Sequence, residues 1–287
     1  MKRVFYFAIF FFSSIITNKV YTNCLFLINC IRFKSPFYFQ RIKNPRTFNE
    51  KISFIKFNVR NPKSPIVADK YEVRKFVGER IGSNFLVPLI GVFDRIEDID
   101  FNVLPKKFVL KLNNGSGFNY ICLDKQKLDV GYVTNLFKKA LNTNIYYLSR
   151  EWHYKEIKSR LVIEKFLGSN IKDYKVHCNK EEGPFCIQVD LDRFSLHKRS
   201  IYDLNWNKLD IKYVYSIASS EIDKPLNFDL MLELARKLSV DFIYSRIDFY
   251  EIEGDLYFGE ITLHPEGGVG PFNKYYSDLF MGGFIKI

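Results

Sequence analysis

Two strand-length segments near the C-terminus place the tightest limits on how this chain folds. Residues 244–251 and 256–263 alternate apolar and polar side chains, and a short connection around Gly254 joins them. A period of two is typical of a β-strand with one buried face, and a short glycine turn favours an antiparallel hairpin. Ile247 and Phe249 then face a core, so we expect the domain to be built on antiparallel sheet.

Other segments extend this pattern and define the fold class. Short apolar stretches bounded by turn residues predict strands, and apolar side chains at helical spacing predict helices. Antiparallel strand pairs with helices grouped between them predict an α+β fold rather than a doubly wound sheet. The further predicted strands are residues 85–93, 108–112, 120–122, 161–166, 173–178 and 184–190. The predicted helices are residues 49–58, 69–81, 129–148 and 228–238.

The polar face of the C-terminal hairpin is a candidate metal site. Alternation puts Arg246 and Asp248 on one face, and a turn of about three residues around Gly254 places Asp248 opposite Glu260. Two carboxylates that face each other repel unless a cation lies between them, and Mg²⁺ prefers carboxylates combined with phosphate oxygens. The competing interpretation is a solvated hairpin with scattered charges.

A glycine-rich loop in the middle of the chain is a candidate phosphate-binding element. It reads Asn113-Asn-Gly-Ser-Gly117, follows Lys111, and joins the strands predicted at 108–112 and 120–122. Glycines allow backbone N–H groups to approach a phosphate, and a lysine adds a point charge. The P-loop spacing is missing, and a Rossmann turn would lead into a helix. An ordinary hairpin turn is the alternative.

Two neighbouring segments could contribute to the same site. The apolar residues 161–167 contain Glu164 and Lys165 at a strand end, where a hinge would offer backbone groups to an adenine edge. Asp173 and Lys175 share a face of the next strand by alternation, where they are available to ribose and phosphate. The alternatives are a plain strand end and a surface ion pair.

Residues 190–199 are polar and basic and form a candidate site for an anionic acceptor. Lysine and arginine bind carboxylates and phosphates through charge-assisted hydrogen bonds, and a solvated loop is the alternative. Asp190-Leu-Asp192 also resembles the D-x-D metal motif of glycosyltransferases that use sugar nucleotides. His153, His177 and His264 lack metal-ligand spacing, so we expect them to be structural. The candidate acceptor-binding residues are Arg193, His197, Lys198 and Arg199.

The net charge of +11 is concentrated at the N-terminal end. Residues 1–63 carry 12 Lys and Arg and a single acid, Glu50, whereas the remaining residues carry equal numbers of each sign. A nucleic-acid binder usually carries its basic face on the folded domain, so we expect no nucleic-acid partner. A basic, aromatic-rich segment suits an anionic membrane surface. Five cysteines without a C-x-x-C pair indicate reduced thiols.

The extreme N-terminus allows three interpretations. The apolar run at residues 4–16 is too short to span a bilayer, and a second apolar stretch follows at residues 24–31. An interfacial or core-docked helix is favoured over a membrane anchor. A secretion signal is the third possibility, although no small-residue cleavage site follows the run.

Together these elements resemble the ATP-grasp superfamily, and specifically its TupA-like family, which is found among surface-polysaccharide genes. The resemblance runs from about Asn44 to the C-terminus. It is carried by Asn44-Pro-Arg-Thr-Phe-Asn-Glu-Lys51, Asp69-Lys-Tyr-Glu-Val-Arg74, residues 105–117, Arg150-Glu-Trp-His-Tyr-Lys155, Glu164-Lys165, Asp173-Tyr-Lys175, Gln188-Val-Asp-Leu-Asp-Arg193, His197-Lys-Arg199, Tyr202-Asp-Leu-Asn-Trp206, Arg246-Ile-Asp248 and Gly259-Glu-Ile-Thr262.

The resemblance implies two α+β lobes that hold ATP and Mg²⁺ between them. Arg246 and Lys175 would be catalytic, with Arg246 stabilising the transferring phosphoryl group or an acyl-phosphate oxyanion. Asp248, Glu260 and Thr262 would hold Mg²⁺. Many members have Asn where this chain has Thr262, so whether one or two ions bind is left open. The nucleotide-binding residues would be Lys111, Asn114, Gly115, Ser116, Gly117, Glu164, Lys165, Phe166, Leu167 and Asp173.

We expect an N-terminal segment at residues 1–35, an α/β portion at 36–104, and an ATP-grasp domain at 105–287 with lobes divided near residue 165. The implied activity is an ATP-dependent carboxylate–amine ligase that joins an amino acid to an acidic sugar, free or lipid-linked, in a surface polysaccharide. The alternatives are a sugar-nucleotide glycosyltransferase and a non-catalytic membrane-peripheral scaffold. Because ATP is cytosolic, we expect a cytoplasmic protein with peripheral contact at the inner face of an anionic membrane.

Overall fold

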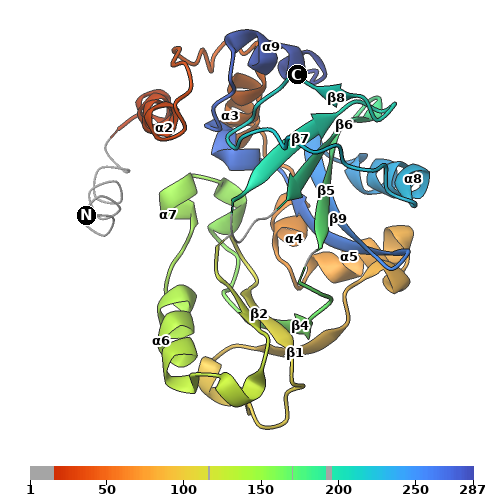
Figure 1. Cartoon of the computed structure of the whole chain (residues 1–287). Helices are drawn as coiled ribbons and strands as arrows, with labels where there is room; N and C mark the ends of the chain where they lie inside the picture. Colours follow the sequence, from red (N-terminus) through yellow and green to blue (C-terminus); the bar gives the residue numbers. More distant parts are fainter. Residues whose placement is uncertain (1–15, 116, 170, 192–195) are drawn as a thin grey trace.

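Two antiparallel sheets organise the chain into two lobes, as the computed structural model shows (Figure 1). The structure describes residues 16–115, 117–169, 171–191 and 196–287. A four-stranded sheet forms the small lobe, and a six-stranded sheet forms the large lobe. The predicted α+β class is therefore confirmed.

The small lobe has the strand order β1-β4-β2-β3, and every neighbouring pair is antiparallel. Helix α6 (Val130–Leu141) buries Val133, Phe137 and Ala140, which share one apolar core with β2 and β4. The hairpin predicted around the glycine-rich loop is the β2–β3 pair. The strands are β1 (Leu89–Phe93), β2 (Phe108–Leu112), β3 (Asn119–Cys122) and β4 (Leu161–Lys165).

The large lobe has the strand order β10-β9-β5-β6-β7-β8, again antiparallel throughout. The C-terminal hairpin is its β9–β10 edge, with β5 next to β9. The predicted strands in this lobe are confirmed, with ends that differ by one residue. The strands are β5 (Lys172–Asn179), β6 (Gly183–Leu191), β7 (Lys198–Tyr202), β8 (Lys208–Leu209), β9 (Tyr244–Ile252) and β10 (Asp255–Thr262).

The two faces of the large sheet have different surroundings. Tyr174, Ile247 and Phe249 point to one face, where α5 (Val73–Ile81) and α8 (Phe228–Ser239) complete the core (Figure 1). Alternate residues on the same strands, such as Lys175 and Arg246, point to the opposite face and line the space toward the small lobe. The alternation in the sequence therefore separates the residues that face the core from the residues that face the space between the lobes.

Helix α3 (Phe48–Asn58) belongs to the large lobe. It begins at a capping box, in which the Thr47 hydroxyl accepts from the Glu50 N–H and the Glu50 carboxylate accepts from the Thr47 N–H. Its buried Phe48 packs with α9 (Tyr275–Gly283) on the sheet face that α8 does not cover. Because α3 joins the large lobe and β1 joins the small sheet, residues 36–104 contribute to both lobes.

Local features shift three predicted boundaries. The helix expected at 69–81 starts at Val73, because the Asp69 carboxylate accepts from two backbone N–H groups and forms a turn after α4 (Ser64–Ala68). The helix expected at 129–148 divides into α6 and α7 (Tyr146–Ser149), and Asn144 Oδ1 accepts from the Tyr146 N–H where the second begins. The strand expected at 85–93 begins after Pro88. The 3₁₀ turns are η1 (Ser83–Phe85), η2 (Ile96–Asp98), η3 (Lys125–Lys127), η4 (Trp152–Tyr154) and η5 (Pro265–Gly268).

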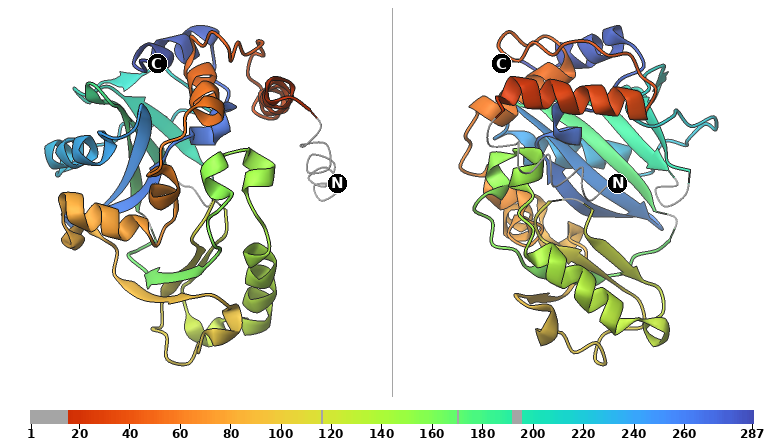
Figure 2. Two further views of the ribbon diagram at one scale, coloured as in Figure 1. Left: turned by 180° about the vertical axis from the view of Figure 1, so that it is seen from behind. Right: turned by 90° about the vertical axis from the view of Figure 1, so that its left-hand side faces the viewer.

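Helix α2 (Asn18–Arg32) lies across the surface and contacts both lobes (Figure 2, right). The Tyr21 hydroxyl donates to the Leu148 carbonyl, and Asn29 Nδ2 donates to the Val269 carbonyl at 3.0 Å. Phe26 is fully buried. The second apolar stretch of the sequence is therefore a docked helix, whereas residues 4–15 of the first stretch lie outside the described residues.

Two further observations concern the N-terminal segment and the thiols. Within the described ranges, the structure contains no helix of the length and apolarity that crossing a bilayer requires. All five cysteines are free thiols, as the sequence indicated, and only Cys24 is exposed.

Candidate functional site

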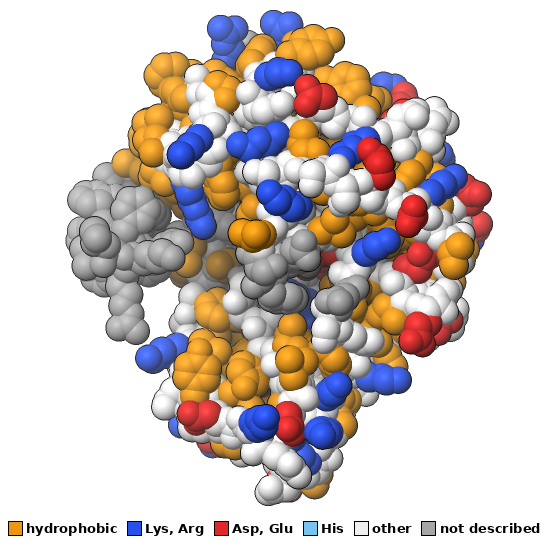
Figure 3. Space-filling view, in the orientation of Figure 1, with side chains coloured by type: hydrophobic (Ala, Val, Ile, Leu, Met, Phe, Trp, Pro, Cys, Tyr) orange, Lys and Arg blue, Asp and Glu red, His pale blue; other side chains and the backbone are white. Residues whose placement is uncertain are grey.

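A cleft between the lobes contains two adjoining cavities, and the surface is visibly hollowed there (Figure 3). The larger has a volume of about 630 Å³ and the smaller about 430 Å³. Gly117, His197 and Tyr215 line both cavities. One extended ligand could therefore occupy both.

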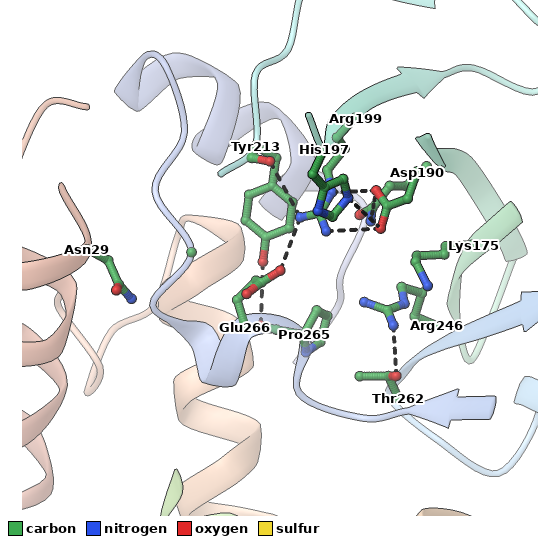
Figure 4. Close-up of polar contacts among 12 residues, drawn as sticks. Asn29, Lys175, Asp190, His197, Arg199, Tyr213, Arg246, Thr262, Pro265 and Glu266 are labelled. Carbon is green, nitrogen blue, oxygen red and sulfur yellow. Dashed lines mark hydrogen bonds and ion pairs between the residues drawn. The ribbon is translucent and has the colours of Figure 1, made fainter. Parts of the chain in front are cut away.

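The carboxylate pair predicted from the hairpin lies at the wall of the larger cavity, which Glu260 lines. Glu260 pairs with Asp248 across the β9–β10 ladder. The Arg246 guanidinium joins them, since Nη2 lies 2.7 Å from Asp248 Oδ2, 3.2 Å from Glu260 Oε1 and 3.0 Å from Thr262 Oγ1 (Figure 4 shows the Arg246–Thr262 bond). The sequence thus placed all four residues in one cluster correctly.

Lys175 completes this cluster from the neighbouring strand. Its ammonium donates to Asp173 Oδ2 at 2.6 Å and to Asp248 Oδ2. Asp248 is 1% exposed, and both of its oxygens accept from these cations. The Glu260 side chain is 39% exposed. Asp248 therefore lies deepest in the cluster, whereas Glu260 and Thr262 line the cavity and offer it their side-chain oxygens.

Lys70 also belongs to this site, although the sequence analysis did not select it. It lines the larger cavity, and its Nζ donates to the Gly115 carbonyl at 2.6 Å. Partial burial opposes ionisation of Glu260, but the Lys70 ammonium, followed by Arg246, lowers its pKa to about 2. Glu260 is therefore a carboxylate at neutral pH. The motif Asp69–Arg74 contributes to the family resemblance, but the sequence analysis assigned no role to Lys70.

The glycine-rich loop forms part of the wall of the larger cavity. Gly115 and Gly117 line it with positive φ angles of 73° and 93°, in the left-handed region that glycine tolerates. Asn114 instead turns into the small lobe, where Nδ2 donates to Ser159 Oγ at 3.2 Å, so it braces the loop. Ser116, another predicted binding residue, lies outside the described residues.

The smaller cavity is lined by the predicted hinge and ribose residues. Lys165, Phe166, Leu167 and Asp173 form part of its wall, and Glu164 and Lys111 lie there too. Lys111 Nζ and Glu164 Oε2 are 2.6 Å apart, and Arg74 approaches Glu164 Oε1 at 3.3 Å. The two predicted residues therefore form an ion pair between adjacent strands.

The combined arrangement fits Mg²⁺ with a nucleoside triphosphate. The smaller cavity offers apolar and backbone groups at a strand end, the junction offers a glycine loop, and the larger cavity offers cations beside hard oxygen donors. Glu260 and Thr262 are oxygen ligands of the kind that Mg²⁺ prefers, and phosphate oxygens would complete the shell. Arg246 and Lys175 would neutralise phosphate charge from the opposite side.

The predicted acceptor residues have separate environments (Figure 4). Arg199 Nε lies 2.7 Å from Asp190 Oδ1, and its Nη1 lies 3.1 Å from Glu266 Oε1, so both of its sides are paired. His197 lines both cavities and stacks on Tyr215 with ring centroids 3.6 Å apart. Lys198 precedes Arg199 on β7, so alternation directs it away from the cavity that Arg199 lines. Arg193 lies outside the described residues.

The D-x-D interpretation lacks support at Asp190. This carboxylate is 1% exposed and accepts from Arg199 and from Gln188 Nε2. Asp192, its partner in the motif, lies outside the described residues. A buried carboxylate paired with arginine is a structural ion pair rather than an open metal ligand.

Two histidines that the sequence analysis treated as structural converge with Glu151 at the wall of the larger cavity. His264 follows β10, and His153 lies in η4, directly after Glu151 and Trp152. Ligand atoms of Glu151, His153 and His264 lie within 4.8 Å of one another. Burial lowers the pKa of His153 to about 3 and also lowers that of His264, so both imidazoles are neutral at pH 7. No spacing rule joins positions more than 100 residues apart, which is why the sequence did not reveal this group.

Comparisons with known proteins give one family match. The family model described as TupA-like ATPgrasp matches residues 50–286. The comparison with curated proteins gives no match.

Several solved structures are similar at low sequence identity. N5-carboxyaminoimidazole synthetase from Staphylococcus aureus, solved with ADP, is 16% identical, with 76% of this chain and 50% of that chain covered and a TM-score of 0.45. D-alanine-D-alanine ligase from Helicobacter pylori is 18% identical, with 83% and 69% covered and a TM-score of 0.44. L-amino acid ligase from Bacillus licheniformis is 15% identical, with 70% and 44% covered and a TM-score of 0.43. The chain spans about half the length of the first of these.

Proposed function

The chain belongs to the TupA-like ATP-grasp family, and from this premise we propose that it is an ATP-dependent carboxylate–amine ligase. The observation that supports this most is the cluster of Glu260, Thr262, Arg246, Lys175 and Lys70 beside the hinge-lined cavity. Enzymes of the ATP-grasp type use ATP with Mg²⁺, and this cluster has the charges and oxygen donors that such a pair requires.

The proposed reaction has two steps. A substrate carboxylate attacks the γ-phosphate of ATP, which gives an acyl phosphate and ADP, and an amine then displaces phosphate to form an amide. Arg246 and Lys175 would donate to the transferring phosphoryl group, and Lys70 would contact phosphate below the glycine loop. Mg²⁺, held at Glu260 and Thr262 with Asp248 at the base, would neutralise phosphate charge.

We propose an acidic sugar and an amino acid as the substrates, in the synthesis of a surface polysaccharide. Family membership supports this proposal, as does the wall of the larger cavity, where Lys56, Arg199 and His197 offer hydrogen-bond donors to an acidic substrate. We also propose a cytoplasmic location, because ATP is cytosolic. A sugar-nucleotide glycosyltransferase is disfavoured because Asp190 is paired with Arg199 and is therefore not available to ligate a metal ion.

Substitution of the carboxylates tests the proposal. Glu260→Gln and Asp248→Asn should each lower turnover by at least ~10²-fold, because one removes a cation ligand and the other removes the anion that holds Arg246 and Lys175. Turnover is measured as ADP release with ATP, Mg²⁺, a panel of uronic acids and a panel of amino acids. The matched control is Glu233→Gln, an exposed carboxylate on α8.

Nucleotide binding separates the ligase from its rival. Mg²⁺ with ATP should raise the Tm of the wild-type protein, and uridine or guanosine sugar nucleotides should not. Near-normal turnover in both carboxylate variants, or stabilisation by the sugar nucleotides alone, would contradict the assignment.

A further inference from the structure

We propose that Glu151, His153 and His264 form a second metal site, suited to a borderline divalent cation of the Zn²⁺ class, on the wall of the cleft. This proposal does not depend on the ligase reaction, because it concerns three residues outside the nucleotide cluster. The three side chains come from two sequence motifs that the proposed function leaves unused, one around Trp152 and one after β10.

The geometry matches a tetrahedral ion. His264 Nδ1 and Glu151 Oε1 lie 3.4 Å apart, which is long for a hydrogen bond. Two ligands that each lie ~2.0–2.1 Å from one tetrahedral zinc ion are separated by roughly that distance. The His153 and His264 ring centroids lie 5.2 Å apart, so the two imidazoles are direct neighbours in this group. The third ligand atom is within reach, since the whole group fits inside 4.8 Å.

Two buried nitrogens in the group lack a hydrogen bond of normal geometry. His153 is 2% exposed and His264 is 4% exposed. Among the described atoms, the Nδ1 atoms of both rings have no hydrogen-bond partner, and His264 Nδ1 has only the long contact with Glu151 Oε1. Buried polar atoms are almost always hydrogen-bonded, so these two nitrogens beside one carboxylate need an explanation, and a cation ligated by this group supplies it.

The ligand set determines the class of metal. Two imidazoles and one carboxylate favour Zn²⁺ and related transition ions, whereas Mg²⁺ prefers oxygen donors such as Glu260 and Thr262. Three protein ligands leave one tetrahedral position open, and Glu151 and His264 both line the larger cavity. A water molecule or an oxygen or nitrogen atom of a substrate could occupy the open position.

Two neighbouring charges oppose a cation here. Burial is the main cause of the lowered pKa of His264, and the Lys56 ammonium and the Arg60 guanidinium lower it further. However, Lys56 Nζ donates to the Gly267 carbonyl at 2.6 Å, so this contact fixes the ammonium at Gly267 and leaves the Glu151 carboxylate for the cation. The lysine should weaken the site without blocking it.

Metal titration of the full-length protein tests the proposal. After removal of metals with a chelator, Zn²⁺ is titrated by calorimetry in the presence of millimolar Mg²⁺, which occupies the carboxylate cluster. Wild-type protein should bind one Zn²⁺, and Co²⁺ in its place should give the visible absorption of a four-coordinate, imidazole-ligated ion. His153→Gln and His264→Gln should each weaken Zn²⁺ binding by at least ~10²-fold. Glu151→Gln, the most conservative of the three substitutions, should weaken Zn²⁺ binding measurably.

Two controls identify the site. His197→Gln removes another cleft imidazole, and Asp248→Asn alters the other metal cluster, so both should bind Zn²⁺ like the wild type. Zn²⁺ should raise the Tm of the wild type and of both controls, but not of the His264 variant. The proposal is overturned if no Zn²⁺ binds above the Mg²⁺ background, if His264→Gln binds normally, or if Asp248→Asn alone abolishes binding.

Discussion

At the scale of single residues, the position of Lys70 gives the clearest new prediction for nucleotide binding. Its ammonium lies under the glycine loop and beside Glu260. A charge-assisted contact with phosphate contributes about 1.5–3 kcal/mol, so Lys70→Met should weaken ATP binding by about 10- to 100-fold. Calorimetric titration with ATP and Mg²⁺ measures this. Lys75→Met, an exposed lysine on α5, is the matched control, and equal affinities in the two variants would remove Lys70 from the site.

A second prediction at this scale concerns pH and His177. This imidazole is fully buried and accepts or donates at Tyr244 Oη, 2.8 Å away, and burial lowers its pKa to about 3. Because its pKa in the unfolded chain is higher, the unfolded state binds more protons between these values, and stability falls as the pH drops below about 6.5. His177 alone should cost about 2 kcal/mol between pH 7 and pH 5. Denaturant unfolding should show a flatter pH dependence in His177→Gln. An unchanged slope would contradict this assignment.

The residues also show how far sequence reasoning extends. Asp248, Glu260, Arg246 and Thr262 were found because strand alternation and cross-strand pairing are local rules. Lys70 and the Glu151 group were missed because their positions depend on contacts between distant segments. The orientation of Asn114 into the small lobe likewise depends on Ser159, which lies in another segment.

At the scale of elements, the β9–β10 hairpin contains the predicted pairing of Asp248 with Glu260, but its turn differs from the predicted one. The sequence suggested a turn of about three residues. The structure instead pairs Asp255 with Ile252 and then shifts register between Phe258 and Glu260. The bulge at Gly259 thus restores the pairing of Glu260 with Asp248. A bulge is difficult to predict because it depends on the partner strand and not on periodicity.

This bulge leads to a prediction for Gly259. A Cβ added there would lie 3.1 Å from the Asp248 carbonyl oxygen and 3.2 Å from the Tyr250 ring. Gly259→Ala should therefore disturb the bulge and lower Mg²⁺-dependent ATP binding by at least ~10-fold, because the pairing that places Glu260 depends on it. Gly131→Ala, in helix α6, is the control and should be neutral or slightly stabilising, as alanine is a better helix former. If the Gly259 variant binds ATP normally, the bulge does not set the site.

At the scale of the whole molecule, α2 connects the basic N-terminal region to the cleft. Its inner face docks on both lobes, and Leu25 lines the larger cavity. Its outer face exposes Val20, Cys24, Leu27 and Ile31, which follow one stripe at spacings of four, three and four residues, and hydrophobic side chains gather over this part of the molecule in Figure 3. Lys19 and Arg32 lie at the two ends of α2, and Lys34, Arg41 and Lys43 follow the helix in the sequence. An apolar stripe with a basic border is the pattern of a helix that lies on an anionic membrane.

We therefore expect the full-length protein to sediment with anionic liposomes through α2. Each Lys or Arg near an anionic surface contributes about 1 kcal/mol, an attraction that falls off within a Debye length, so binding should require anionic lipid and weaken as salt rises. The double variant Leu27→Asp with Ile31→Asp should lose binding, because it places two carboxylates on the docking face. The matched control is Val103→Asp with Leu226→Asp, a double variant at two exposed apolar residues elsewhere on the surface, which should bind normally.

Binding that survives the α2 variant but is lost when residues 1–15 are deleted would place the contact outside α2. Binding lost equally in both double variants would reflect added negative charge alone. A contact through α2 would hold the cleft near the membrane surface, where a lipid-linked acceptor would be located.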